Sequence, residues 1–90
     1  MLVPRREARI LEARGERFRF YWDGEVLHIE QRHGTTTDDA IATFFDGGPS
    51  QWDTEHRRYE TLSETHGIYW ARHAHDGSVI IISCWKRENI

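Results

Sequence analysis

The last third of the chain, residues 57–86, carries the pattern that most restricts the fold. Asp76-Gly77 is a strong signal for a β-hairpin turn, because both residue types tolerate positive φ angles. His66-Gly67 indicates an earlier turn, and the residues around these two turns alternate in the manner of β-strands. We therefore predict an antiparallel meander over residues 57–86.

The two turns also set a register for the meander. Counting outward from Asp76-Gly77 pairs Arg72 with Ile81, and the earlier turn places Leu62 beside Ala71. Because side chains alternate across a strand, each strand then has one residue set on each face of the sheet.

One face is apolar and is expected to be the core face, covered by helices. It carries Leu62, Tyr69, Ala71, Ile80, Ile82 and Cys84. The second face mixes guanidinium groups with aromatic rings. It carries Arg57, Tyr59, Thr61, Trp70, Arg72, Ile81, Ser83 and Trp85.

The first half of the chain predicts one strand and three helices. Pro4 fits the first turn of a helix over about residues 4–14, and residues 17–22 alternate as a strand. Asp23 is expected to cap a helix over about residues 24–33. Thr36 or Thr37 is expected to cap the next helix, which ends at about residue 45.

Ninety residues make one domain. The order of elements predicts an α+β fold, with helices packed on one face of a small antiparallel sheet of about four strands. Residues 1–16 are expected to form an accessory N-terminal helix, because Arg residues there outnumber apolar ones. Residues 17–90 are expected to form the domain itself.

Composition excludes several kinds of protein. Cys84 is the single cysteine, so neither an internal disulfide nor a cysteine-based zinc site is possible, and its apolar neighbours predict a buried thiol. No apolar run reaches the ~18 residues of a membrane span, and the N-terminus has no apolar signal core. We therefore expect a cytoplasmic protein that needs no metal or other cofactor.

Charge is unevenly distributed along the chain. The total is −3, but residues 1–20 carry six Arg and three Glu, while residues 21–56 carry one Arg and eight acidic residues. A uniformly basic nucleic-acid binder would not have this distribution. A protein with one basic face beside an acidic one would.

The segment QRHG, residues 31–34, ends a short predicted helix with two basic side chains. Cations are favourable at a helix C-terminus, and Gly34 suits the residue just past the last turn. Capping alone therefore explains Arg32 and His33. The alternative is that this helix end presents both side chains to an anionic ligand.

The second sheet face favours a nucleic-acid ligand. Arg binds phosphate, and Trp or Tyr stacks on unpaired bases. The alternative is that Trp70 and Trp85 belong to the core of a sheet that is covered on both sides. A metal site is not favoured, because the six His residues include no pair with helical i, i+4 spacing.

Two long segments resemble BrnT-type toxins in the order and spacing of their motifs. The first, WDGEVLHIEQRHGTTTDDAIATFFD, has Trp-Asp, a basic-His-Gly helix end, a Thr-capped helix and a closing Phe-Phe-Asp. The second, RRYETLSETHGIYWARHAHDGSVIIISCWKRE, has paired Arg, Gly turns and Ile-Ile-Ser. The resemblance covers about residues 20–88.

The resemblance implies a RelE-like fold and a ribonuclease toxin of a type II toxin–antitoxin pair, which cleaves RNA without metal. The family's basic-His-Gly motif falls on Arg32, His33 and Gly34, and its paired arginines fall on Arg57 and Arg58. We expect four catalytic residues. His33 would act as acid or base, and Arg32, Arg57 and Arg72 would bind phosphate. We expect the substrate to be bound also by Arg58, Tyr59, Trp70, Trp85 and Lys86.

The partners implied are an RNA substrate and a cognate antitoxin with a ribbon-helix-helix DNA-binding domain. Operator DNA would be contacted only through the antitoxin, and no membrane is involved. The N-terminal helix could mediate self-association. A second hypothesis stays open: a non-catalytic interaction module, either a degenerate toxin or a small regulator from mobile DNA.

Overall fold

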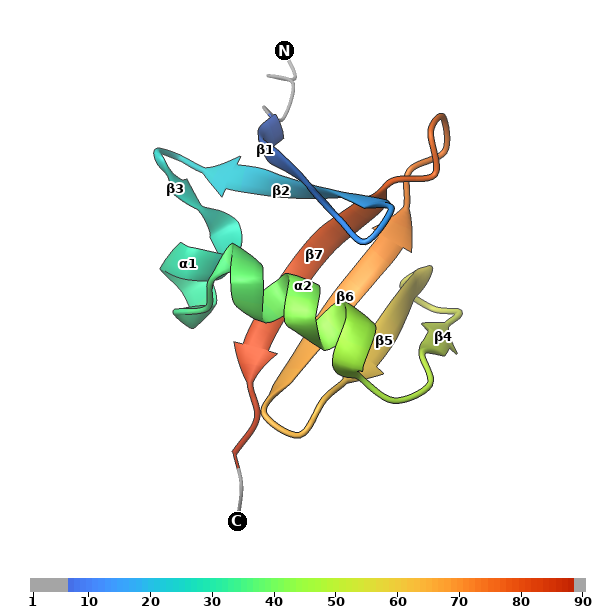
Figure 1. Cartoon of the computed structure of the whole chain (residues 1–90). Helices are drawn as coiled ribbons and strands as arrows, with labels where there is room; N and C mark the ends of the chain where they lie inside the picture. The colour runs from blue at the N-terminus through green and yellow to red at the C-terminus, as the bar shows by residue number, and fades with distance from the viewer. Residues whose placement is uncertain (1–6, 89–90) are drawn as a thin grey trace.

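The computed structural model describes residues 7–88 (Figure 1). The elements in chain order are β1 Glu7–Ala13, β2 Glu16–Asp23, β3 Val26–Leu27, α1 His28–His33, α2 Thr37–Asp46, β4 Gln51–Asp53, β5 Arg58–Leu62, β6 His66–Arg72 and β7 Val79–Lys86.

The strands form one seven-stranded mixed sheet, in the order β1-β2-β7-β6-β5-β4, with β3 paired to β2. All strand pairs are antiparallel except β2 and β7, which run parallel. The expected α+β architecture, with helices on an antiparallel sheet of about four strands, is therefore wrong. The two described helices are short, and the sheet is larger and mixed.

The predicted N-terminal helix is wrong over the described part of its range, and residues 4–6 of the prediction lie outside the described residues. Residues 7–13 form β1, which pairs with β2 from Ala13 and Glu16 outward. Arg14 and Gly15 both have positive φ, as a two-residue hairpin requires. The described residues 7–13 therefore form no helix through which the chain could self-associate.

The helix predicted over residues 24–33 begins later than expected. Asp23-Gly24 makes a tight turn with Gly24 at φ 73°, and Asp23 pairs with Val26 to form the β2–β3 hairpin. Only His28–His33 is helical, and Gly34 ends the helix in the left-handed conformation. The predicted capping by Asp23 is therefore replaced by a hairpin turn.

The predicted strand over residues 17–22 and the helix after Thr36 are confirmed. The hydroxyl of Thr36 accepts a hydrogen bond from the Asp39 backbone N–H, and the Asp39 carboxylate accepts one from the Thr36 N–H. This reciprocal capping box fixes the start of α2.

The meander is confirmed, but its predicted register is wrong. Arg72 pairs with Val79 instead of Ile81, and Leu62 pairs with Gly67 instead of Ala71. The Asp76-Gly77 segment lies in a loop over residues 73–78 that is wider than a two-residue hairpin. A bulge in the β6–β7 pairing then shifts the alternation of β7.

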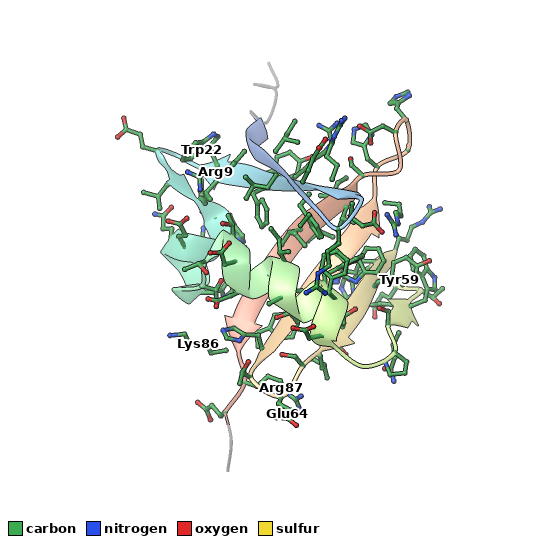
Figure 2. All side chains as sticks on the ribbon, viewed as in Figure 1. Arg9, Trp22, Tyr59, Glu64, Lys86 and Arg87 are labelled. Atoms are coloured by element: carbon green, nitrogen blue, oxygen red, sulfur yellow. The ribbon has the colours of Figure 1, made fainter. Side chains whose placement is uncertain are left out.

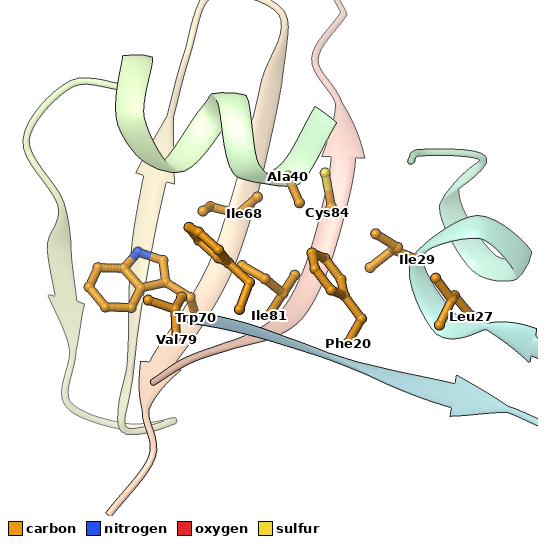
Figure 3. Packing of buried hydrophobic residues seen from close by; sticks show 10 residues of the cluster. Phe20, Leu27, Ile29, Ala40, Ile68, Trp70, Val79, Ile81 and Cys84 are labelled. Carbon is orange, nitrogen blue, oxygen red and sulfur yellow. The ribbon is translucent and has the colours of Figure 1, made fainter. Parts of the chain in front are cut away.

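The core lies between the sheet and the two helices (Figure 3). Phe18 and Phe20 of β2, Ile68 of β6 and Val79 of β7 are essentially inaccessible to solvent. Phe44 of α2 packs edge-on against Phe18 and against the indole ring of Trp70. The cluster also includes Leu27, Ile29, Ala40, Ile81 and Cys84. Burial raises the pKa of the Cys84 thiol, and the predicted buried cysteine is confirmed.

The two faces of the sheet differ in what covers them. In Figure 1, α2 lies across β6, and α1 lies beside β7. We call the side that faces α2 the covered face; it includes Tyr59, Thr61, Ile68 and Trp70. We call the opposite side the open face; on the meander it carries Arg58, Glu60, Tyr69, Ala71, Ile80, Ser83 and Trp85.

Candidate nucleic-acid interface

The open face carries a row of planar groups in contact across three strands, with Arg58 over the Tyr69 ring and Trp85 tilted against it by 43°. The Arg58 guanidinium carbon lies 3.7 Å from the centroid of the Tyr69 ring, and the Tyr69 and Trp85 ring centroids are 4.7 Å apart. Gly67 makes room for this row, because a Cβ atom there would overlap the Trp85 ring. A guanidinium stacked beside two rings suits a ligand that combines anionic and flat groups.

Arg58 is held in place but keeps hydrogen-bonding capacity. Its Nε lies 3.8 Å from an Asp53 carboxylate oxygen, which is too far for a hydrogen bond, and it has no hydrogen-bond partner within the described residues. The Asp53 carboxylate is engaged instead by His56, whose hydrogen bond lowers the Asp53 pKa. Because Nε is buried, only the terminal nitrogens of Arg58, which form no hydrogen bond within the described residues, are donors for a ligand oxygen.

His33 stands at the edge of the open face. Its Nε2 lies 3.1 Å from the Ser83 hydroxyl, and its ring centroid lies 5.8 Å from that of His28. The imidazole is exposed, since it sits in the last turn of α1. An exposed imidazole next to a hydroxyl is a suitable general acid or base by residue type and position.

Arg32 and His28 converge on one carboxylate. Arg32 Nε donates a hydrogen bond of 3.1 Å to Asp23 Oδ2, and His28 Nδ1 lies 3.5 Å from the same oxygen. The Arg32 bond lowers the pKa of Asp23, so this carboxylate is ionised at neutral pH. Arg32 therefore has a second role besides favouring the helix end, because its side chain links α1 to the β2–β3 hairpin.

Arg57 and Arg72 do not join this group. Arg72 donates to both carboxylate oxygens of Glu16 and lies over the covered-face rings of Phe44 and Trp70. Arg72 pairs with Val79, whereas His33 contacts Ser83, four residues along β7 or roughly 13 Å. Arg57 is exposed, with a φ of 55°, just before β5. The four expected catalytic residues therefore do not form one site.

Two of the expected stacking residues lie on the covered face. Trp70 is 7% exposed, and its indole N–H donates to the Thr61 hydroxyl. Tyr59 stacks on Trp70 with ring centroids 4.5 Å apart, and Trp52 packs against Tyr59 from β4. For Trp70, the core alternative is the one that the structure supports.

Trp85 and Lys86 occupy the end of β7. Trp85 lies on the open face, while Lys86 is exposed and pairs across the sheet with His66. In Figure 2, Lys86 and Arg87 project near the end of β7, far from Tyr59. Arg87 donates a hydrogen bond to the Ser63 carbonyl oxygen, so Lys86 is the less constrained of these two cations.

The residues that the sequence did not single out are Asp23, His28, Tyr69 and Ser83. The prediction that Leu62, Tyr69 and Ala71 face the core is wrong, because the alternate β6 residues Ile68 and Trp70 face α2 instead. Asp23-Gly24 is the same kind of turn signal as Asp76-Gly77, and it could have located the hairpin that brings Asp23 to Arg32.

A cavity of about 350 Å³ opens beside His33, between the diverging strands β2 and β7. Its lining is Tyr21, Trp22, Asp23, His28, Arg32, Ile80, Ile81 and Ile82. Within residues 7–88, no group of three or more His, Cys, Asp or Glu side chains is arranged to hold a metal ion.

Neither described helix is long and apolar enough to cross a membrane. Comparisons with protein-family models, with curated proteins and with solved structures found no match to the chain. The geometry of the open face and the motif order of the sequence are therefore what a functional assignment rests on.

Proposed function

We propose that this chain binds single-stranded RNA on its open face and acts as a ribonuclease toxin, with His33 as its acid–base group. The observation that carries the proposal is the row of contacting planar groups Arg58, Tyr69 and Trp85 next to the exposed His33–Ser83 pair. Aromatic rings bind unpaired bases, and guanidinium groups bind the phosphates between them.

The resemblance to BrnT-type toxins supports the same assignment. His33 lies in the basic-His-Gly motif, and Arg58 is the second of the paired arginines. In cleavage, His33 would take the proton of a 2′-hydroxyl, whose oxygen attacks phosphorus while the 5′-oxygen leaves and takes a proton from water. Arg32 and Arg58 would offset the negative charge that accumulates on the phosphate oxygens.

A second candidate function is a non-catalytic interaction module. It is favoured by one observation: Arg72 is tied to Glu16 on the covered face, away from His33. The hydrogen bond to Glu16 raises the Arg72 pKa, as expected of a structural ion pair. Such a chain would bind RNA or its partner without cleaving either.

The experiment measures binding and cleavage of a short unpaired RNA separately. Arg58→Gln should weaken binding and reduce the salt dependence by about 0.7 in the log–log slope, the effect of losing one phosphate contact to a single strand. Trp85→Ala should cost about 1–3 kcal/mol of binding free energy. Arg14→Gln is the matched control, because Arg14 lies over Phe45 on the helix side.

His33→Ala separates the two candidates. If the chain is a ribonuclease, this variant binds RNA but neither cleaves it nor slows the growth of a bacterial host. If the unmodified protein binds RNA without cleaving it, the non-catalytic module is the correct function. RNA binding that is unaffected by Arg58→Gln and Trp85→Ala would refute the proposed interface.

The proposal includes a partner and a location. A cytoplasmic toxin must be kept inactive in its own cell, and we propose a ribbon-helix-helix antitoxin that covers the open face and alone contacts operator DNA. Co-expression of the neighbouring reading frame, with a tag on this chain, tests this. A chain that always purifies alone would contradict it.

A further inference from the structure

The cavity beside His33 has a lining that the proposed interface does not use. Its floor is formed by Ile80, Ile81 and Ile82 of β7, and Trp22 supplies an aromatic wall. Its polar groups come from Tyr21, Asp23, His28 and Arg32, of which the last three meet at the Asp23 carboxylate. Its volume of about 350 Å³ is at the small end of ligand pockets, which span roughly 300–1,000 Å³.

Only one of the two Asp23 carboxylate oxygens is contacted by Arg32 and His28. Both the Arg32 hydrogen bond and the His28 contact go to Oδ2. Within residues 7–88, Oδ1 of Asp23 has no partner of its own. An ionised, immobilised acceptor at the mouth of an apolar pocket selects ligands that present an N–H donor.

The Arg32 guanidinium also keeps donors that form no hydrogen bond within residues 7–88. Only its Nε is bound, and its side chain is 64% exposed. Asp23 fixes the guanidinium plane, so its terminal nitrogens can hold a phosphate oxygen outside the pocket. Apolar floor, aromatic wall, anionic acceptor and guanidinium together match one nucleotide: a flat base inside and its phosphate at the rim.

We propose that this cavity is a base-specificity pocket that selects a nucleobase with an exocyclic amino group, donated to Asp23 Oδ1. This inference rests on the proposed RNA binding and deepens it, because Ile80, Ile82 and Ser83 are neighbours on β7. A base in the pocket would place its phosphate beside Arg32 and next to His33. Cytosine then binds better than uracil, whose carbonyl at the same position is an acceptor facing a carboxylate.

The test compares two five-nucleotide RNAs, oligocytidylate and oligouridylate, by equilibrium binding to the full chain. The two have equal charge and similar stacking surfaces, so their ratio reports the donor group alone. We expect the unmodified protein to prefer oligocytidylate by about tenfold, the effect of one charge-assisted hydrogen bond.

Four variants sharpen the result. Asp23→Asn should bring the preference close to one, because the amide is neutral and adds a donor. Arg32→Lys keeps a cation beside Asp23 and should keep the preference, while Asp23→Ser, which also removes the carboxylate, covers the case that Asp23→Asn unfolds. Glu25→Gln is the matched control, since it removes one negative charge from the same hairpin outside the cavity and should change nothing.

The possible failures are distinguishable. If both RNAs bind equally to the unmodified protein and Trp85→Ala weakens both, the pocket inference is wrong and the proposed interface stands. If neither RNA binds, the proposed RNA-binding function is wrong, and the inference about the pocket is wrong as well. A preference that survives Asp23→Asn in a folded variant would place the selecting group elsewhere.

Discussion

Asp76 shows how one residue converts a predicted turn into a wider loop. Its carboxylate accepts hydrogen bonds from the Ser78 hydroxyl and backbone N–H, and from Arg19 at 2.5 Å. The Ser78 bonds, followed by the Arg19 bond, hold the pKa of Asp76 far below its ordinary value. This network ties the loop over residues 73–78 to β2, across 57 positions in sequence.

The Asp76 network predicts a loss of stability in acid. Because the folded pKa is depressed, the stabilisation is present above the unfolded pKa of about 3.9 and is lost as pH falls toward the folded value. Urea unfolding should therefore show Asp76→Asn as destabilised at pH 7 and nearer to the unmodified protein at pH 3. Glu64→Gln, which removes an exposed acid, is the control; an Asp76→Asn deficit that does not change with pH would contradict the prediction.

Gly67 is predicted to be irreplaceable because of Trp85. A methyl group at residue 67 would overlap the indole ring, and the Leu62 side chain is also close. Gly67→Ala should destabilise the fold by about 1–3 kcal/mol, as overpacking does, and should change the fluorescence of Trp85. Gly48→Ala is the control, since its nearest neighbour would lie at an ordinary 3.9 Å. Equal stability of the two variants would show that the ring moves freely.

At the scale of elements, the start of α2 depends on a local motif. Thr36→Ala removes the hydroxyl that accepts the Asp39 N–H and should cost about 0.5–2 kcal/mol of stability. Chemical denaturation measures this directly. Thr65→Ala is a suitable comparison, because that exposed hydroxyl contacts only the neighbouring His66 ring. An unaffected Thr36→Ala protein would mean that packing alone positions α2.

Elements with a strong local signal could be predicted from the sequence. Alternation gave the strand over residues 17–22, and Thr, Asp and the apolar stripe gave α2. The strand β1 could not be recognised, because its Arg and Glu residues suit an exposed helix equally well, and only pairing with β2 decides. The same holds for the bulge in the β6–β7 pairing, which no local pattern indicates and which places both Ile81 and Cys84 of β7 in the core.

The site was only partly predictable for the same reason. Arg32, His33, Arg58 and Trp85 were recognised by residue type, and the structure places all four at or beside the open face. Arg57 and Arg72 were grouped with them because both were predicted on the Trp70 face of the meander, which α2 covers in the structure. Asp23, which binds Arg32, was missed because Asp23 lies in the β2–β3 hairpin, where a helix was predicted.

At the scale of the whole molecule, a net charge of −3 and an RNA ligand are compatible only if cations gather on one side. Arg58 lies on the open face, Arg32 lies at its edge, and Lys86 and Arg87 lie at the end of β7. Glu60 also faces this side, next to Tyr69. The proposed RNA binding should therefore depend on base stacking as much as on charge, and its affinity should fall only moderately as the salt concentration rises.

The four tryptophans lie at different places on the molecule, so they allow the most direct test of the proposed RNA-binding surface. Trp85 lies on the open face, Trp22 lines the cavity, and Trp52 and Trp70 belong to the opposite side. The measurement is a titration of isotope-labelled protein with a short unpaired RNA, following the four indole N–H signals by nuclear magnetic resonance. We predict that the Trp85 and Trp22 signals shift with a common saturation curve while those of Trp52 and Trp70 stay in place. Shifts confined to Trp52 and Trp70, or none at saturating RNA, would contradict RNA binding on the open face.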